Sequence, residues 1–169
     1  DETRRYLLEA QRLALKEKDY QSLWTAYNHE GMAHGYVCEF AEGESCFLRM
    51  MKLGEAWGIT PYLVIPKSNI TVSIYALDGR IEAALKCSQE ALQLALQSDD
   101  PYLKGFAYNA CGSAFFRKGL FREAEENLIP AIEMAQKTNF VGVLFLGLLQ
   151  LGHLRFEMGR YQEAQESCD

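Results

Sequence analysis

The stretch of the chain that determines its fold is residues 108–131, which read YNACGSAFFRKGLFREAEENLIPA. Its first half has small or apolar residues at i, i+3, i+4 and i+7, the spacing of one face of an amphipathic helix, namely Tyr108, Cys111, Gly112 and Phe115. Gly119 predicts the end of that helix, because glycine readily takes the left-handed backbone conformation found just past helix ends. A second stripe follows at Phe121, Ala124, Leu128, Ala131, Ile132 and Ala135. The stretch therefore predicts two consecutive helices joined by a short turn.

This two-helix pattern recurs along the chain with a period of about forty residues. The tripeptide Ala-Tyr-Asn occupies residues 26–28 and again residues 107–109, an offset of 81 residues that needs no gap. Asn69 divides that offset into steps of 41 and 40 residues. Turn glycines then follow at intervals of 40 residues, at Gly79, Gly119 and Gly159. Agreement at so many positions indicates an internal repeat in which each unit contributes one pair of helices.

The same pattern gives expected helices at residues 2–17, 20–36, 41–56, 61–77, 80–97, 101–118, 121–137, 140–158 and 161 onward. They group into four pairs, at 20–57, 60–97, 100–137 and 140–169, preceded by a lone helix at 2–17. No linker interrupts the pattern, so residues 1–169 are predicted to form a single all-α domain. We expect this domain to be a segment of a longer chain, because the sequence starts without Met and its last helix is cut short.

Prolines modify this expectation at three places. Asp100 and Pro101 predict a helix start, with Asp100 as the N-cap and Pro101 at the first helical position. Pro130 lies inside an expected helix, where it removes a backbone donor and is expected to kink the chain. Pro66 is expected to bend its helix or to delay its start, with residues 62–65 briefly extended.

Composition and charge exclude several classes of protein. With 49% hydrophobic and 24% charged residues, the 169-residue chain is not a disordered segment. Its net charge of −6 argues against nucleic acid as the main partner, since phosphate binding needs a concentrated basic surface. The longest apolar run, residues 140–149, is shorter than the roughly 18 residues of a membrane span, so no membrane partner is expected. The cysteines lack paired spacing and predict reduced, mostly buried thiols in a cytoplasmic protein: Cys38, Cys46, Cys87, Cys111 and Cys168.

The units resemble the tetratricopeptide repeat. That family's pattern is a Leu-Gly pair, an aromatic residue, a turn glycine, a second aromatic residue, then alanine, a large apolar residue and alanine. Residues 111–131 match it, and the neighbouring units match through Tyr75, Gly79, Ile81, Ala84 and Ala91 and through Leu151, Gly152, Gly159, Tyr161 and Ala164. The period of about forty resembles the long-repeat branch of the family, as in kinesin light chain and bacterial signalling and transcriptional regulators with repeat arrays.

Some positions depart from the family pattern, most of them in the first unit. Cys38 stands at the turn glycine, and His34 and Arg155 stand where the first aromatic residue belongs. The resemblance implies a right-handed solenoid, a superhelix of antiparallel helix pairs in which the first helix of each pair lines a concave surface. In such proteins the repeats bind partners, while catalytic or DNA-binding parts lie elsewhere in the chain.

On that implied concave surface, Asn28, Asn69 and Asn109 recur at one position in three consecutive units. An asparagine amide both donates and accepts hydrogen bonds, so such a ladder suits an extended peptide backbone. The alternative is that the ladder only fixes the stacking of neighbouring units, and the sequence leaves both open. The candidate binding residues are Asn28, Asn69, Ser73, Asn109, Ser113, Phe116, Arg117, His153 and Phe156.

No residue set in the sequence predicts catalysis or a bound cofactor. The histidines of residues 29–34, HEGMAH, are five residues apart, whereas the zinc-protease motif needs them at i and i+4. Adding Cys38 gives no standard ligand set, so no metal site is predicted and His34 is expected to be a packed helix residue.

The sequence thus favours a non-enzymatic protein–protein interaction scaffold within a larger cytoplasmic signalling or regulatory protein. Its concave groove would bind an extended peptide or partner segment. The alternative function is a small-molecule sensor domain of a multidomain transcriptional regulator, ATPase or cyclase. A deep apolar pocket around Phe116, His153 and Phe156 would favour the sensor, and an open groove lined by the three asparagines would favour the peptide.

A stack of repeats without polar capping helices exposes apolar surface at its ends. We therefore expect the 169-residue chain to self-associate as its concentration rises. Size-exclusion chromatography with light scattering measures the mass directly, and a monomeric mass over the whole concentration range would contradict the expectation.

Overall fold

The expected helices are present in a computed structural model, which describes residues 2–167. Within those residues the chain is all-helical and contains no β-strand. The elements are α1 (Glu2–Glu17), α2 (Tyr20–Tyr36), α3 (Phe40–Trp57), α4 (Pro61–Ile70), the π-helical turn η1 (Thr71–Tyr75), α5 (Ile81–Leu96), α6 (Pro101–Lys118), α7 (Phe121–Lys137), α8 (Val141–Glu157) and α9 (Tyr161–Glu166). Expected and observed boundaries agree to within two residues, although the helix expected at 61–77 is divided between α4 and η1.

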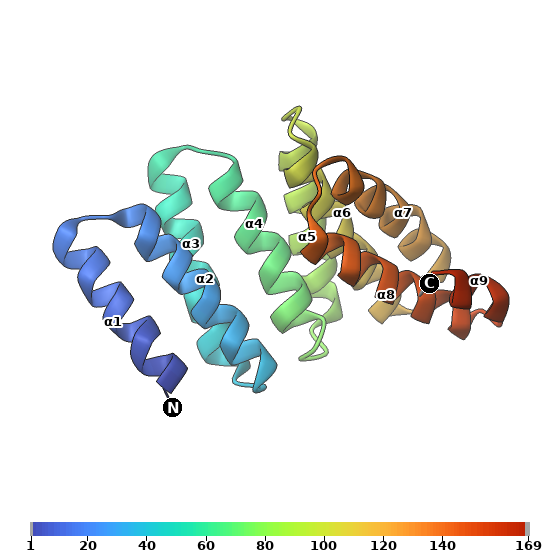
Figure 1. Cartoon of the computed structure of the whole chain (residues 1–169), viewed down its shortest axis with the longest axis horizontal. Coiled ribbons are helices and arrows are strands. Elements are labelled where there is room, and N and C mark those ends of the chain that lie inside the picture. The colour runs from blue at the N-terminus through green and yellow to red at the C-terminus, as the bar shows by residue number, and fades with distance from the viewer. Residues whose placement is uncertain (1, 168–169) are drawn as a thin grey trace.

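The helices follow one another along the long axis of the molecule in the order of the sequence (Figure 1). Each helix packs against the next, and the even-numbered helices also contact one another: α2 contacts α4, α4 contacts α6, and α6 contacts α8. Between residues 2 and 167, no odd-numbered helix approaches the next odd-numbered one in this way. The helices therefore form two layers, of which the even-numbered layer is the more closely spaced.

Residues in the left-handed backbone conformation end many of the helices. Gly119 has a φ of 80° and ends α6, where its N–H donates a hydrogen bond of 3.0 Å to the carbonyl of Phe116. Cys38, which takes the place of the turn glycine in the first unit, has the same conformation with a φ of 60°. This conformation disfavours residues that carry a Cβ atom. The repeat therefore imposes the turn geometry even where the sequence lacks glycine.

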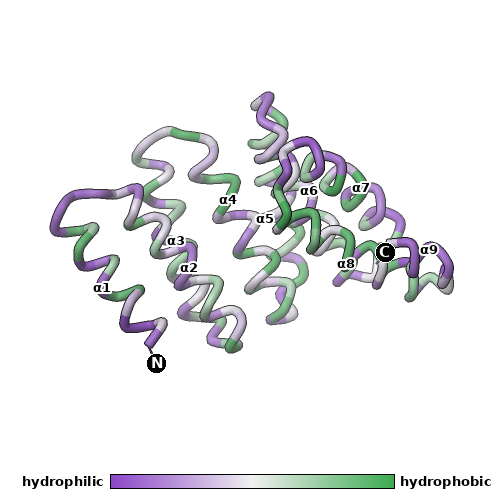
Figure 2. Tube along the Cα trace, in the orientation of Figure 1, coloured by the Kyte–Doolittle hydropathy of each residue, from purple (hydrophilic) through white to green (hydrophobic). Residues whose placement is uncertain are grey.

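Small residues allow paired helices to approach closely. A Cβ atom at Gly112 of α6 would lie 2.6 Å from Cγ of Leu128 in α7. At Gly31 of α2 it would lie 2.9 Å from Cζ of Phe47 in α3. On the facing side, Ala124 is fully buried, as are the other repeat alanines Ala84, Ala91 and Ala131. Hydrophobic and hydrophilic residues alternate along the helices (Figure 2). Clusters of buried apolar residues extend from α2 to α8.

The prolines confirm some of the sequence-based expectations and contradict another. Asp100 caps α6 as expected, since its side chain accepts a hydrogen bond of 2.8 Å from the backbone N–H of Tyr102. The expectation of an extended segment at residues 62–65 is wrong, because α4 begins at Pro61 and is helical through Pro66. The lost hydrogen bond at Pro66 is outweighed by packing, since α4 buries Val64 and Ile70 completely. Pro130 lies inside α7, which runs on to its expected end.

Ion pairs recur at equivalent positions of the repeat. In the first and third units, Glu44 and Glu125 occupy the same position of the second helix. Tyr75 donates a hydrogen bond of 2.8 Å to Glu44, and Nε of Arg155 lies 3.2 Å from Glu125. Each carboxylate also pairs with an arginine from the turn before the next second helix, Arg80 and Arg160 respectively. Arg155 therefore departs from the aromatic pattern but makes the same link between units that Tyr75 makes.

The close contact at Gly112 gives a stability prediction with a matched control. Gly112→Ala forces Cβ into Leu128 and is expected to destabilise the chain by about 1–3 kcal/mol. Gly142→Ala, in exposed α8 backbone where the new Cβ meets only Phe140 at 3.4 Å, is expected to be neutral or stabilising by up to about 1 kcal/mol. Urea unfolding followed by circular dichroism measures both, and equal stability changes would contradict the close-packing argument.

Candidate functional site

A cavity of about 440 Å³ opens among α2, the α4–η1 segment, α6 and α8, on the side of the even-numbered layer. Most of the candidate binding residues line it. They are Asn69 and Ser73 from the α4–η1 segment, Asn109, Ser113, Phe116 and Arg117 from α6, and His153 from α8. The structure thus brings together seven residues that the repeat had placed at related positions in three separate units.

The walls of the cavity are mainly apolar. Val72 of η1, Phe106 of α6, and Val143, Leu146 and Leu149 of α8 line it beside Phe116. The sequence analysis missed several lining residues, namely Tyr36, Leu77, Phe106, Val143, Leu146 and Gln150. Helical spacing was the available signal on α8, because residues 143, 146, 150 and 153 follow one another at i, i+3, i+7 and i+10. Of these four residues, only His153 was predicted from the sequence.

One wall of the cavity is formed by closely packed backbone. A Cβ atom at Gly35 of α2 would lie 2.6 Å from the carbonyl oxygen of Ser73 in η1. Both residues line the cavity. This contact leaves no room for a side chain at position 35 and fixes the position of η1 against α2.

Asn109 has hydrogen-bonding capacity to spare inside the cavity wall. It is 96% buried, and within residues 2–167 its Oδ1 atom accepts no hydrogen bond. A buried acceptor without a partner costs roughly 1–3 kcal/mol. Because this oxygen is itself covered by surrounding atoms, a donor on a molecule in the cavity reaches it only if the Asn109 side chain rotates.

Asn28 and Asn69 are joined to each other. Nδ2 of Asn69 donates a hydrogen bond of 2.8 Å to Oδ1 of Asn28, from α4 to α2. This bond supports the stacking role for that pair of the asparagine ladder. Asn28 does not line the cavity, whereas Asn69 does, so ligand contact remains a prediction for Asn69 and Asn109.

Arg117 and His153 lie at the end of the cavity near Phe116. The rings of Phe116 and His153 meet edge-on with centroids 5.0 Å apart, and His153 lies 3.3 Å from Glu157. Ser113 donates a hydrogen bond of 2.6 Å to Gln150. Arg117 is exposed and forms no ion pair with any residue that the structure describes. An anionic group bound at this end would meet an available cation.

Phe156 does not reach the cavity. Its side chain is 58% exposed and meets the ring of Tyr161 at a centroid distance of 5.3 Å. The prediction placed it one helical turn beyond His153, on the same side of the helix. The cavity ends before that turn.

The histidines and Cys38 considered in the sequence do not converge. His29 is exposed, and its Nδ1 atom lies 2.9 Å from the Thr25 carbonyl oxygen. Cys38 is exposed in its turn, whereas His34 is buried as expected. His34 instead lies beside Glu30 and Cys46, a combination that the sequence analysis did not consider.

The described cysteines, Cys38, Cys46, Cys87 and Cys111, are free thiols, and Cys168 lies outside the described residues. Burial, with a contribution from the hydrogen bond to Glu30, raises the pKa of Cys46 to about 12. Burial also raises the pKa of Cys111 to about 11. These two thiols are therefore protonated at neutral pH, as buried cysteines are expected to be.

Comparison with known proteins leaves the family open. No protein-family model matches the chain, and no curated protein matches it significantly. In the part of the chain that the structure describes, no helix is both long enough and apolar enough to cross a membrane. The candidate site therefore has to be interpreted from its own geometry.

The hydrogen bond between Asn28 and Asn69 predicts a measurable coupling. We expect a double-mutant cycle with Asn28→Ala and Asn69→Ala to give a coupling free energy of about 0.5–1.5 kcal/mol, because each single change leaves one amide unpaired. Urea unfolding of the four proteins measures it. Additive stability changes would show that the bond does not hold α4 against α2.

Proposed function

We propose that the chain is a non-enzymatic interaction scaffold, a right-handed solenoid of tetratricopeptide-like repeats that belongs to a cytoplasmic signalling or regulatory protein. The cavity among the even-numbered helices binds a segment of a partner protein. The single observation that carries the proposal is the convergence of seven predicted residues on one apolar cavity.

The spacing of the two layers supports this arrangement. A stack of helix pairs curves toward the layer whose helices lie closer together. The even-numbered helices are in contact with one another, so they lie on the inner side of the curve, where the cavity is. Free thiols at the described cysteines are consistent with the reducing cytoplasm.

The cavity wall indicates which partner segment fits. Apolar side chains from η1, α6 and α8 favour a large aliphatic or aromatic side chain as the anchor. Arg117, which has no acidic partner among the described residues, favours a neighbouring Asp, Glu or terminal carboxylate. Asn109, whose amide can both donate and accept, favours a backbone peptide group once its side chain turns toward the cavity. The partner segment is therefore expected to carry a large apolar residue next to an acidic group.

A small-molecule sensor is the second candidate function, and one observation favours it. The cavity volume of about 440 Å³ falls within the roughly 300–1,000 Å³ of ordinary ligand pockets. An apolar carboxylic acid would use the same wall and the same arginine. A ligand-observed NMR screen of such acids tests this candidate against the peptide.

Selection of random peptides displayed on phage tests the proposal. We expect the selected sequences to share a large apolar residue next to Asp or Glu. Fluorescence anisotropy with a labelled peptide then measures affinity, and we expect Arg117→Glu to weaken it at least tenfold, about 1.4 kcal/mol. Leu146→Trp, which fills the cavity from its partly exposed rim, is expected to abolish binding.

Arg122→Glu provides the matched control for Arg117→Glu. Arg122 is an exposed arginine of α7 that lies outside the cavity and pairs with Glu126 at 3.1 Å. The same charge reversal there is expected to leave peptide affinity unchanged. Selected peptides that bind Arg117→Glu and Leu146→Trp as well as the unchanged chain would contradict binding in this cavity.

A further inference from the structure

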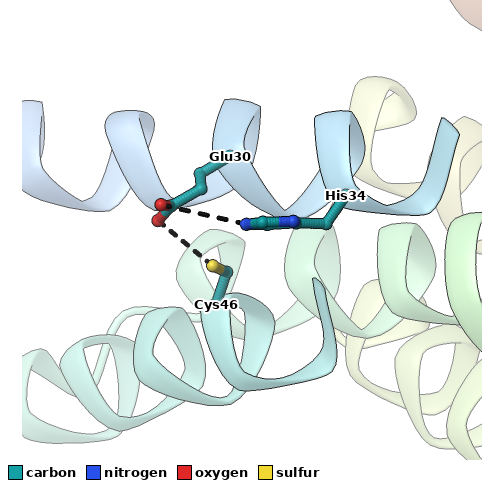
Figure 3. A group of neighbouring side chains, drawn as sticks. All are labelled: Glu30, His34 and Cys46. Atoms are coloured by element: carbon teal, nitrogen blue, oxygen red, sulfur yellow. Dashed lines mark hydrogen bonds and ion pairs between the residues drawn. The ribbon is translucent and has the colours of Figure 1, made fainter. Parts of the chain in front are cut away.

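A buried group of metal-ligand side chains lies between α2 and α3, away from the cavity (Figure 3). Glu30 and His34 are one turn apart on α2, and Cys46 faces them from α3. Nε2 of His34 lies 4.0 Å from Oε1 of Glu30, and Sγ of Cys46 lies 3.2 Å from Oε2 of Glu30. The three ligand atoms all lie within 4.8 Å of one another.

Surrounding side chains hold these groups in place. Nδ1 of His34 lies 2.6 Å from a carboxylate oxygen of Glu39, so the ring turns its Nε2 atom toward Glu30 and Cys46. Nε2 of Gln11, from α1, donates a hydrogen bond of 2.7 Å to Glu30. A carboxylate on the far nitrogen of a ligating histidine is the usual way in which proteins orient metal-binding imidazoles.

The other repeat units carry no such set at the equivalent positions. The second unit has Thr71, Tyr75 and Cys87 there, and the third has Cys111, Phe115 and Asn127. In the second and third units, the positions equivalent to Glu30, His34 and Cys46 are therefore occupied by ordinary residues of a helix pair. Only 8% of Glu30 is exposed, and burying a carboxylate is costly. Hydrogen bonds from Gln11 and Cys46 offset part of this cost, and a bound cation would compensate the charge itself. The first unit therefore contains a buried carboxylate that the repeat pattern does not require.

We propose that Glu30, His34 and Cys46 bind a zinc ion in the first repeat unit. One carboxylate, one imidazole and one thiolate form a ligand set that suits Zn²⁺ and disfavours Mg²⁺ and Ca²⁺, which require oxygen ligands throughout. Ligand atoms around tetrahedral zinc lie about 3.3–3.8 Å apart, so the longest separation here must shorten by about 1 Å. On binding, the Cys46 thiol loses its proton to solvent and the sulfur coordinates as thiolate.

A fourth ligand can enter from solvent. A cleft of about 330 Å³ borders the three ligands and is also lined by Arg4, Ala41, Glu42, Ser45 and Arg49. Three protein ligands with one open position are the pattern of zinc sites that hold an exchangeable water or anion. The proposed site is therefore accessible to exogenous ligands, although its protein ligands are buried.

Cobalt(II) titration of the chelator-treated chain tests the proposal, because Co²⁺ replaces Zn²⁺ and reports its ligands by absorption. We expect one equivalent to give a thiolate-to-cobalt charge-transfer band together with the intense visible bands of tetrahedral coordination, and Zn²⁺ to displace it. Cys46→Ser and His34→Gln are expected to abolish the charge-transfer band or the tetrahedral bands, respectively. Glu39→Gln is expected to weaken zinc affinity about 10–100-fold.

Cys38→Ser and His29→Gln are the matched controls, since both residues are exposed and lie on the same helix pair or its turn. They are expected to leave the titration unchanged. Thermal unfolding without metal identifies variants that fail to fold, in which case Cys46→Ala replaces Cys46→Ser. The proposal is overturned by an unchanged chain without a charge-transfer band, by a band that survives in a folded Cys46 variant, or by a band lost in Cys38→Ser.

Discussion

The close contact between the two helices of each pair is the constraint on which the rest of the structure depends. In the first and third pairs it exists because glycine stands where the partner helix presents a large side chain, at Gly31 against Phe47 and at Gly112 against Leu128. A single helix pair cannot bury its apolar stripe alone, so successive pairs must stack. The even-numbered helices then come into mutual contact, and the cavity opens on their side of the array.

Local signals were sufficient to predict the helices. Turn residues such as Gly119 and the cap at Asp100 act within a few residues, so the sequence alone located the helix ends to within two residues. The error at Pro66 has a different origin. A local rule penalises proline inside a helix, but burial of Val64 and Ile70 depends on helices that are distant in sequence.

Only the candidate-site residues that recur at related positions of the repeat could be predicted from the sequence. Ser73, Ser113 and His153 occupy related positions of successive units, and the structure brings them to one cavity. Asn28 and Phe156 belong to the same series but lie beyond the ends of that cavity, which the period does not determine. The grouping of Cys46 with Glu30 and His34 was not predicted, because Cys46 is on another helix and no spacing rule connects the three residues.

The departures from the repeat are more informative about chemistry than the repeat itself. Arg155 replaces an aromatic residue and keeps a link between units, so its departure serves stability. Glu30 and His34 are buried at positions where the second and third units carry neutral residues, so their chemistry is not something that the repeat requires. Positions that break an otherwise regular pattern are where functional residues are expected in proteins built from repeats.

The backbone contact between Gly35 and the Ser73 carbonyl makes the two sides of the cavity mechanically unequal. At this contact the α2–η1 side is defined by main-chain atoms, which rotamer changes do not move, although Tyr36 and Leu77 line the cavity with exposed side chains. The α8 side presents Leu146 and Leu149, whose side chains are partly exposed and free to reorient. If the cavity binds a partner segment as proposed, substitutions on α8 could therefore change its selectivity without disturbing the backbone contact between Gly35 and Ser73.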